Sequence, residues 1–267
     1  MANSMMLSLS AVAALIPAAV LSCRGSAGGR STAYWSVIVV AAAGPLAWLA
    51  ARVADSWHAG LSTALWATIA ASILIFAAVS AMTRETWRLH TILMPYLLAI
   101  GLLAAVLPQA PAQPPAGGAP AAWLQLHIVV AVLTYSLLTV AAVAGVAGLL
   151  QERALKARQP TGLTRRLPSL QDCEALAVGL MIACEVVLAA GLLTGMATQY
   201  FASGTLIELQ HKPLLAVLTF VVIGLLLFAH FRFGVRGRRV TRYVLLAYLL
   251  LTLAYPGVKF VTDVILA

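Results

Sequence analysis

Eight apolar segments separated by short polar connections constrain this chain more than any other feature. Each segment is roughly 18–28 residues long, and a helix of that length crosses the hydrocarbon core of a bilayer, which is about 30 Å thick. We therefore predict an all-α integral membrane protein with eight transmembrane helices. The segments cover residues 5–22, 34–51, 61–82, 89–107, 123–150, 173–196, 213–231 and 243–262.

The basic residues divide unevenly between alternate connections. The connections after the first, third, fifth and seventh segments hold 14 of the 17 Lys and Arg residues, and the others are Arg52, Lys212 and Lys259. Cytoplasmic loops of membrane proteins carry such an excess of Lys and Arg. We therefore predict that the odd connections are cytoplasmic and that both termini lie outside, an N-out/C-out topology.

The composition supports one polytopic membrane domain over residues 1–267, because 62% of the residues are hydrophobic and only 9% are charged. The net charge of +9 indicates loops that face anionic membrane lipid rather than a nucleic-acid partner. We place the protein in a bacterial cytoplasmic (inner) membrane. A stretch rich in Pro and Gly at 108–122 predicts an outer linker between a four-helix front half, 1–107, and a four-helix back half, 123–267.

One carboxyl group falls near the middle of a predicted span. Glu185 is surrounded in the sequence by apolar residues, and charged groups inside membranes are costly and frequently functional. We expect Glu185 to be buried between helices. Two interpretations stay open: a protonated carboxyl that is hydrogen-bonded to a neighbouring helix, or a proton or substrate contact in a polar cavity.

The five histidines all fall near a predicted membrane surface, and four of them form two candidate pairs. His127 and His211 are both predicted near the outer face, in the fifth and seventh spans. His90 and His230 are both predicted near the cytoplasmic face. His211 and His230 are separated by about 28 Å of helix, so they belong to different sites.

Two facing imidazoles suit one kind of ligand better than others. A zinc site needs three or four ligands, and the sequence has neither an HExxH motif nor a Cys/His cluster. Two neutral imidazoles between apolar walls suit the axial positions of a haem iron. The alternative for each histidine is an interfacial polar residue without a ligand.

Short motifs in the back half point to a family. They are WLQLH at 123–127 with Tyr135, LPSLQ at 167–171 with Glu174, GLLTGM at 191–196, QHK at 210–212, HFR at 230–232 with the basic turn at 234–239, and YPGVKF at 255–260. In this order and spacing they resemble the cytochrome c assembly (CcsA-like) family over residues 120–265. No Trp occurs at 197–210, where that family has a Trp-rich segment, and Val235 replaces the Trp of the turn, which favours the HemX/YpjD-like branch.

The resemblance implies a protein that handles haem at the membrane. On this resemblance His127 matches an outer haem ligand and His230 a transmembrane one. Together with the predicted depths, we expect a non-covalent, b-type haem with His127 and His211 as outer axial ligands, and a second, inner site at His230 and His90. Trp123, Tyr200 and Phe201 lie at the predicted level of the outer pair and are candidate contacts of the haem ring. The implied partners are other proteins of cytochrome c assembly or haem synthesis, and no catalytic residue is assigned.

Two functions of other classes stay open. A membrane scaffold or regulator could bind a haem-synthesis enzyme through the basic cytoplasmic loops without carrying haem. A small-solute permease would need polar residues at mid-membrane, where only Glu185 is well placed.

Overall fold

The computed structural model describes residues 2–24, 30–55, 60–107, 120–204, 211–235 and 237–257. This part of the chain is helical throughout and has no strand, which confirms the all-α class. Short 3₁₀ turns lie at Thr86–Leu89 and Thr164–Arg166, and a π-helical turn covers Leu253–Gly257. The α-helices are α1 (Ala2–Arg24), α2 (Thr32–Asp55), α3 (Leu61–Met82), α4 (His90–Val106), α5 (Ala121–Ala157), α6 (Leu170–Ser203), α7 (His211–Phe233) and α8 (Arg238–Thr252).

Seven of these helices are long and apolar enough to cross a membrane. They correspond to the first seven predicted segments. The described part of α8 has 15 residues and starts with three arginines, Arg238, Arg239 and Arg242. At about 1.5 Å per residue it covers only about 22 Å. The eighth span and the N-out/C-out topology therefore stay predictions.

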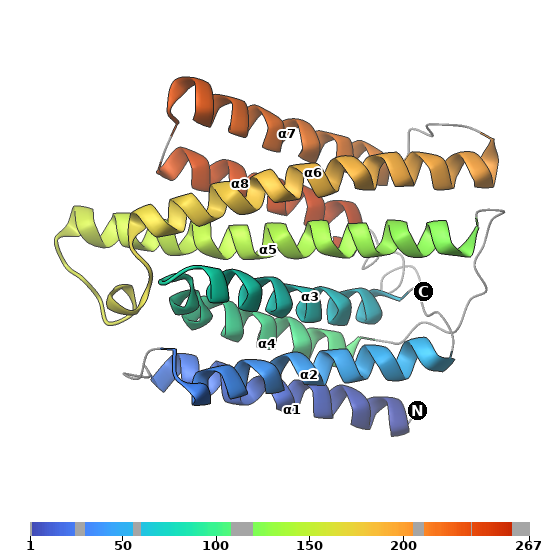
Figure 1. The fold of residues 1–267 in the computed structure, drawn as a ribbon, viewed down its shortest axis with the longest axis horizontal. Helices are drawn as coiled ribbons and strands as arrows, with labels where there is room; N and C mark the ends of the chain where they lie inside the picture. Colours follow the sequence, from blue (N-terminus) through green and yellow to red (C-terminus); the bar gives the residue numbers. More distant parts are fainter. Residues whose placement is uncertain are drawn as a thin grey trace.

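Helices α5 and α6 are longer than a bilayer requires. They contain 37 and 34 residues, which corresponds to about 55 and 51 Å. The Ser169 hydroxyl accepts a hydrogen bond from the Asp172 backbone N–H at 3.2 Å and so caps the start of α6. Figure 1 shows the joined ends of α5 and α6 reaching past the neighbouring helices, so this hairpin extends beyond an untilted hydrocarbon layer.

The helices form a bundle in which α5 is central (Figure 1). Helix α5 packs along α6 and also contacts α3 and α8, whereas α7 contacts α6 and α8 at the margin. One hydrophobic cluster joins α1 to α4 with the C-terminal part of α5 and the N-terminal part of α6, and a second joins α5 to α8. Residues 108–119 lie outside the described residues, so the proposed linker and the division into halves stay predictions.

Polar contacts also connect the front and back helices. The hydroxyls of Tyr96 on α4 and Tyr248 on α8 are hydrogen-bonded, and Tyr135 on α5 donates to Tyr248 at 3.3 Å. Near the basic end, the Arg166 guanidinium donates to the Cys23 carbonyl at the end of α1, at 2.8 Å. The two groups of helices are therefore connected at both the middle and one end of the bundle.

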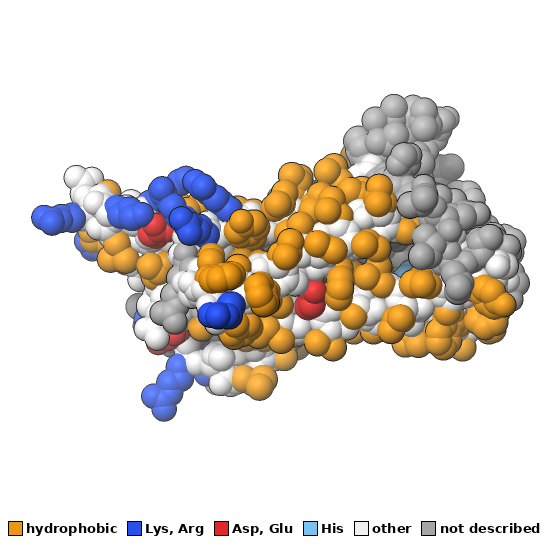
Figure 2. All heavy atoms as spheres, turned by 90° about the horizontal axis from the view of Figure 1, so that it is seen from above, with side chains coloured by type: hydrophobic (Ala, Val, Ile, Leu, Met, Phe, Trp, Pro, Cys, Tyr) orange, Lys and Arg blue, Asp and Glu red, His pale blue; other side chains and the backbone are white. Residues whose placement is uncertain are grey.

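The surface separates by charge along the long axis. Figure 2 shows Lys and Arg side chains gathered at one end and hydrophobic side chains over most of the middle. The helix ends that flank the connections α1–α2, α3–α4, α5–α6 and α7–α8 lie at one end of the bundle (Figure 1). These are the connections that the sequence assigns to the cytoplasm, so the fold is compatible with the predicted orientation.

Candidate functional site

His127 lies in the second turn of α5 and faces α6. Helix α5 begins directly after Pro120, whose carbonyl accepts from the Trp123 backbone N–H at 3.0 Å. The imidazole is half-buried, and its Nδ1 is 3.0 Å from the Oγ1 of Thr194 on α6. His127 is therefore held by a side chain of the neighbouring helix and not by a group of its own helix.

Trp123 lies one turn before His127 on the same side of α5, because residues four apart share a helix face. Its indole Nε1 donates to the backbone carbonyl of Thr194 at 3.2 Å. The Thr194 hydroxyl lies 2.9 Å from the Ala190 carbonyl and 3.1 Å from the Gly191 carbonyl. One residue of α6 thus contacts the polar groups of two side chains of the WLQLH segment, Trp123 and His127.

Glycine allows this close approach of the two helices. A Cβ on Gly195 would lie 3.1 Å from the His127 Cε1, which is tighter than ordinary packing. A Cβ on Gly191 would lie 3.4 Å from the Val130 side chain. The GLLTGM segment therefore provides a surface of small residues against which the imidazole packs.

The other predicted members of the outer site lie along the same end of the bundle. Tyr200 and Phe201 are on α6 about two turns beyond Thr194, and their side chains are 52% and 50% exposed. Their ring centroids are 6.3 Å apart. His211 begins α7, but its side chain lies outside the described residues. The His127–His211 pair and the two ring contacts therefore stay predictions.

His90 is packed in an aromatic cluster at the start of α4. It is only 5% exposed, and its ring stacks on Trp87 with a centroid distance of 5.8 Å. Tyr34 from α2 meets the same ring edge-on at 5.6 Å. The His90 Nδ1 is 2.8 Å from the Trp87 carbonyl, within its own turn.

His230 lies near the end of α7. Its Nδ1 is 2.8 Å from the Val235 carbonyl, and its ring meets Phe231 edge-on. Figure 1 shows α4 and α7 on different sides of α5, so the described contacts of His90 and His230 come from separate parts of the bundle. The inner pair stays a prediction.

Glu185 lies at the contact between α6 and α7. Its side chain is half-buried, and Oε1 is 3.0 Å from the position that a Cβ on Gly224 would occupy. Oε2 is buried and has no hydrogen-bond partner among the described residues. The neighbours Ile182 and Val186 are exposed. The role of this carboxyl stays a prediction.

A second group of polar side chains was not anticipated. The Tyr135 and Thr252 hydroxyls are 3.0 Å apart. The Thr252 hydroxyl also donates to the Tyr248 carbonyl at 2.7 Å. A sequence signal existed, because Tyr96, Tyr135 and Tyr248 each lie inside a predicted span and a buried phenol needs a partner. That signal does not say which spans are neighbours.

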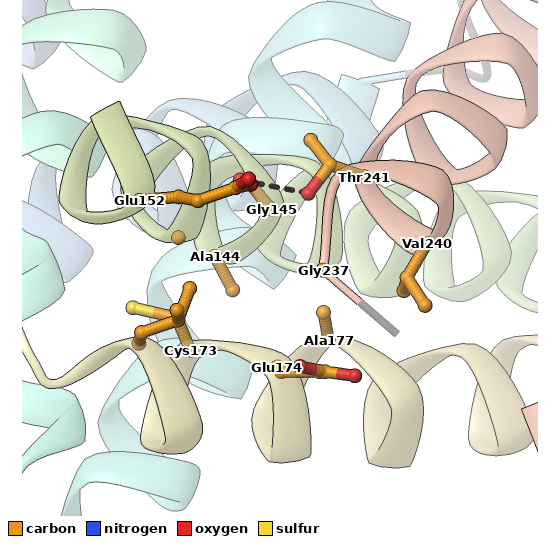
Figure 3. Close-up of a pocket in the computed structure, with 11 residues that line it drawn as sticks. Ala144, Gly145, Glu152, Cys173, Glu174, Ala177, Gly237, Val240 and Thr241 are labelled. Atoms are coloured by element: carbon orange, nitrogen blue, oxygen red, sulfur yellow. Dashed lines mark hydrogen bonds between the residues drawn. The ribbon is translucent and has the colours of Figure 1, made fainter. Parts of the chain in front are cut away.

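A small pocket lies between α5, α6 and the start of α8 (Figure 3). Its wall includes Glu152, which forms ion pairs with Lys156 and, at 3.6 Å, with Arg238. Glu174 from the LPSLQ region also lines it, and Thr241 donates to the Gly145 carbonyl at 3.3 Å. Gly145 is roughly 27 Å along α5 from His127, so this pocket is separate from the His127 region.

Comparison with known proteins identifies the family. The family model described as cytochrome C assembly protein matches residues 30–266. The chain belongs to the cytochrome c assembly protein family. The match includes most of the front half, beyond the 120–265 region in which the motifs lie.

Two relatives extend this result. An uncharacterized 28.8 kDa protein from the nifR3-like 5′ region of Azospirillum brasilense is 55% identical over 270 residues. The alignment covers 100% of this chain and 100% of that protein. Protein HemX of Brevibacillus brevis is 28% identical over 134 residues, which are 50% of this chain and 49% of HemX. This partial match of low identity agrees with the predicted likeness to the HemX-like branch. No solved structure matches the chain.

Proposed function

We propose that this protein holds or passes a non-covalent, b-type haem at the outer membrane face, with His127 and His211 as its axial ligands. Membership of the cytochrome c assembly family supports a haem-related role. The observation that carries the proposal is the hydrogen bond between the His127 Nδ1 and Thr194 on a neighbouring helix. Histidines that bind metals are commonly oriented in this way by a hydrogen bond at the other ring nitrogen.

The residues around His127 fit such a group. A haem supplies an iron that accepts two neutral imidazole nitrogens and a flat apolar ring that needs apolar or aromatic cover. His127 is half-buried, Trp123 lies one turn away, and Tyr200 and Phe201 expose aromatic surface on α6. The role of this chain in the proposal is to orient the imidazole and exclude water from the ring.

Haem content of purified variants tests the proposal. We expect the wild-type protein to purify in detergent with a low-spin, bis-histidine absorption spectrum. His127→Ala or His211→Ala should leave a weakly held haem with one ligand, and the double variant should hold none at the outer site. His58→Ala is the control, because His58 belongs to an outer connection but to neither pair. Unchanged low-spin haem in the double variant would refute the assignment.

The proposal includes eight spans with both termini outside, in a bacterial inner membrane. Cysteine labelling with an impermeant reagent in intact cells tests it. Gln113→Cys in the outer connection should be labelled, whereas Arg158→Cys in the basic connection between α5 and α6 should react only after the membrane is opened. Labelling of Arg158→Cys from outside would contradict the topology.

The inner pair, His90 and His230, is a further part of the proposal. If it binds haem, the His127→Ala, His211→Ala double variant should retain a residual haem signal. That residual signal should disappear when His230→Ala is added. A double variant without any haem would restrict the protein to one site.

A membrane scaffold or regulator of haem synthesis is the second candidate function. The basic side chains at one end of the molecule favour it, because they provide a charged surface for a cytoplasmic partner (Figure 2). A scaffold need not carry pigment. A haem-free wild-type protein that does not bind added haem would favour this function over the first.

A further inference from the structure

Thr194 has an unusual position among the hydroxyl side chains of α6. It is only 8% exposed, and it contacts α5 through both its side chain and its backbone carbonyl. Among the described residues, the Thr198 hydroxyl, one turn further along α6, bonds instead to its own helix and donates to the Gly195 carbonyl at 2.7 Å. The difference indicates that Thr194 does more than satisfy a hydroxyl in an apolar helix.

The hydrogen atoms at this contact can be assigned. A threonine hydroxyl has one proton to donate, and the nearby Ala190 and Gly191 carbonyls can only accept. Donation to one of these carbonyls is the usual behaviour of Thr in helices. In the tautomer with its proton on Nδ1, His127 then donates to the hydroxyl oxygen, and the Gly191 carbonyl is a second acceptor for the ring. A neutral imidazole with its proton on Nδ1 carries its lone pair on Nε2.

The rotation of the ring is restricted as well. The imidazole packs over Gly195, where a Cβ would be 3.1 Å from Cε1. The Trp123 indole is fixed one turn away by its bond to the Thr194 carbonyl. Turning the imidazole away from this surface would break the Nδ1 bond, so tautomer and orientation are determined together.

We propose that Thr194 is the positioning residue of the haem ligand His127: its hydroxyl holds the proton on Nδ1 and presents the Nε2 lone pair to the iron. This inference rests on the proposed function, because it assumes that His127 binds haem. Loss of such an outer-shell partner commonly weakens metal binding by about 10- to 100-fold. In this proposal Thr194 acts through His127 and not on the haem directly.

Three matched variants test the proposal. Thr194→Val keeps the shape of the side chain and removes the hydroxyl, and Thr194→Ser keeps the hydroxyl. Thr198→Val removes a hydroxyl that contacts no imidazole among the described residues. We expect Thr194→Val to bind haem about 10- to 100-fold more weakly and with a mixed-spin spectrum. Thr194→Ser and Thr198→Val should match the wild type. Melting temperatures in detergent show whether each variant is folded.

The tautomer can also be measured without haem. In haem-free protein with ¹⁵N-labelled histidine, protonated and unprotonated ring nitrogens give separate NMR resonances, and His127→Ala identifies the signal. We expect a protonated Nδ1 in the wild type and in Thr194→Ser, and a mixture of tautomers in Thr194→Val. A single Nε2-protonated form in the wild type would overturn the inference.

The two proposals fail in different ways. If His127→Ala keeps unchanged low-spin haem, the proposed function fails and the role of Thr194 fails with it. If His127→Ala loses haem but Thr194→Val matches the wild type in affinity and spin state, only the role of Thr194 is refuted. A Thr194→Val protein that is unfolded leaves the NMR measurement on the wild type and the comparison with Thr194→Ser to decide.

Discussion

His90 and His127 both lie near the start of a membrane helix, but their surroundings differ. The His90 ring is enclosed by Trp87 and Tyr34, and its Nδ1 bonds to a carbonyl of its own turn. The His127 ring is half-buried, and its Nδ1 bonds to a side chain of another helix. The enclosed His90 ring therefore contributes strongly to packing, whereas the His127 ring is both oriented and accessible.

Replacing the two histidines separately should give the largest contrast. His90→Ala should lower the free energy of unfolding by about 2–4 kcal/mol, because it leaves a cavity and removes a stacked ring. His127→Ala should cost only about 1 kcal/mol, the value of one hydrogen bond. Thermal unfolding of both haem-free variants in detergent measures this. Equal losses would show that the two rings contribute equally to packing.

Two glycines extend the comparison to the helix contacts. A Cβ on Gly44 in α2 would lie 2.5 Å from the Ala14 Cβ in α1, so Gly44→Ala should destabilise the protein by about 1–3 kcal/mol without changing haem binding. Gly195→Ala should instead alter the haem spectrum, because it displaces the His127 ring. Gly179→Ala on α6 is the control, since a Cβ there meets nothing within 4 Å. A normal spectrum for Gly195→Ala would argue against a fitted imidazole.

The tyrosine contacts between the front and back helices should have a smaller effect. Tyr248→Phe removes hydrogen bonds to Tyr96 and Tyr135, and interhelical hydrogen bonds in membranes average about 0.6 kcal/mol each. We therefore expect a loss of about 1 kcal/mol, with haem binding unchanged. Tyr243→Phe, at an exposed position of α8, is the control. No difference between the two variants in thermal unfolding would show that these bonds contribute nothing net.

Glu185 should have the smallest effect on stability. Because its Oε2 lacks a partner among the described residues, Glu185→Gln should change the free energy of unfolding by less than about 0.5 kcal/mol, and Glu185→Leu should be no less stable than the wild type. A loss of more than about 1 kcal/mol in the Leu variant would reveal a hydrogen bond, the first interpretation of this residue. Melting temperatures of the three proteins decide it.

The helices could be predicted well because the length of an apolar segment can be read from consecutive residues of the sequence. Seven predicted segments coincide with helices that can cross a membrane. The ends of α5 and α6 were less accurate, since polar residues such as Gln151 continue a helix once it leaves the membrane. The WLQLH and GLLTGM motifs identified the family, which the comparison confirmed, but they did not identify Thr194 as the partner of His127.

Composition, segment length and motif order alone therefore determine an all-α membrane protein of the cytochrome c assembly family. Only the tertiary structure decides which side chains meet, because residues far apart in the chain become neighbours through helix packing. His127 and Thr194 are 67 positions apart, and Tyr96 and Tyr248 are 152 apart. Such contacts depend on the rotation of each helix about its axis. In α4, α5 and α6 the hydrophobicity is nearly uniform around the helix, so it does not encode that rotation.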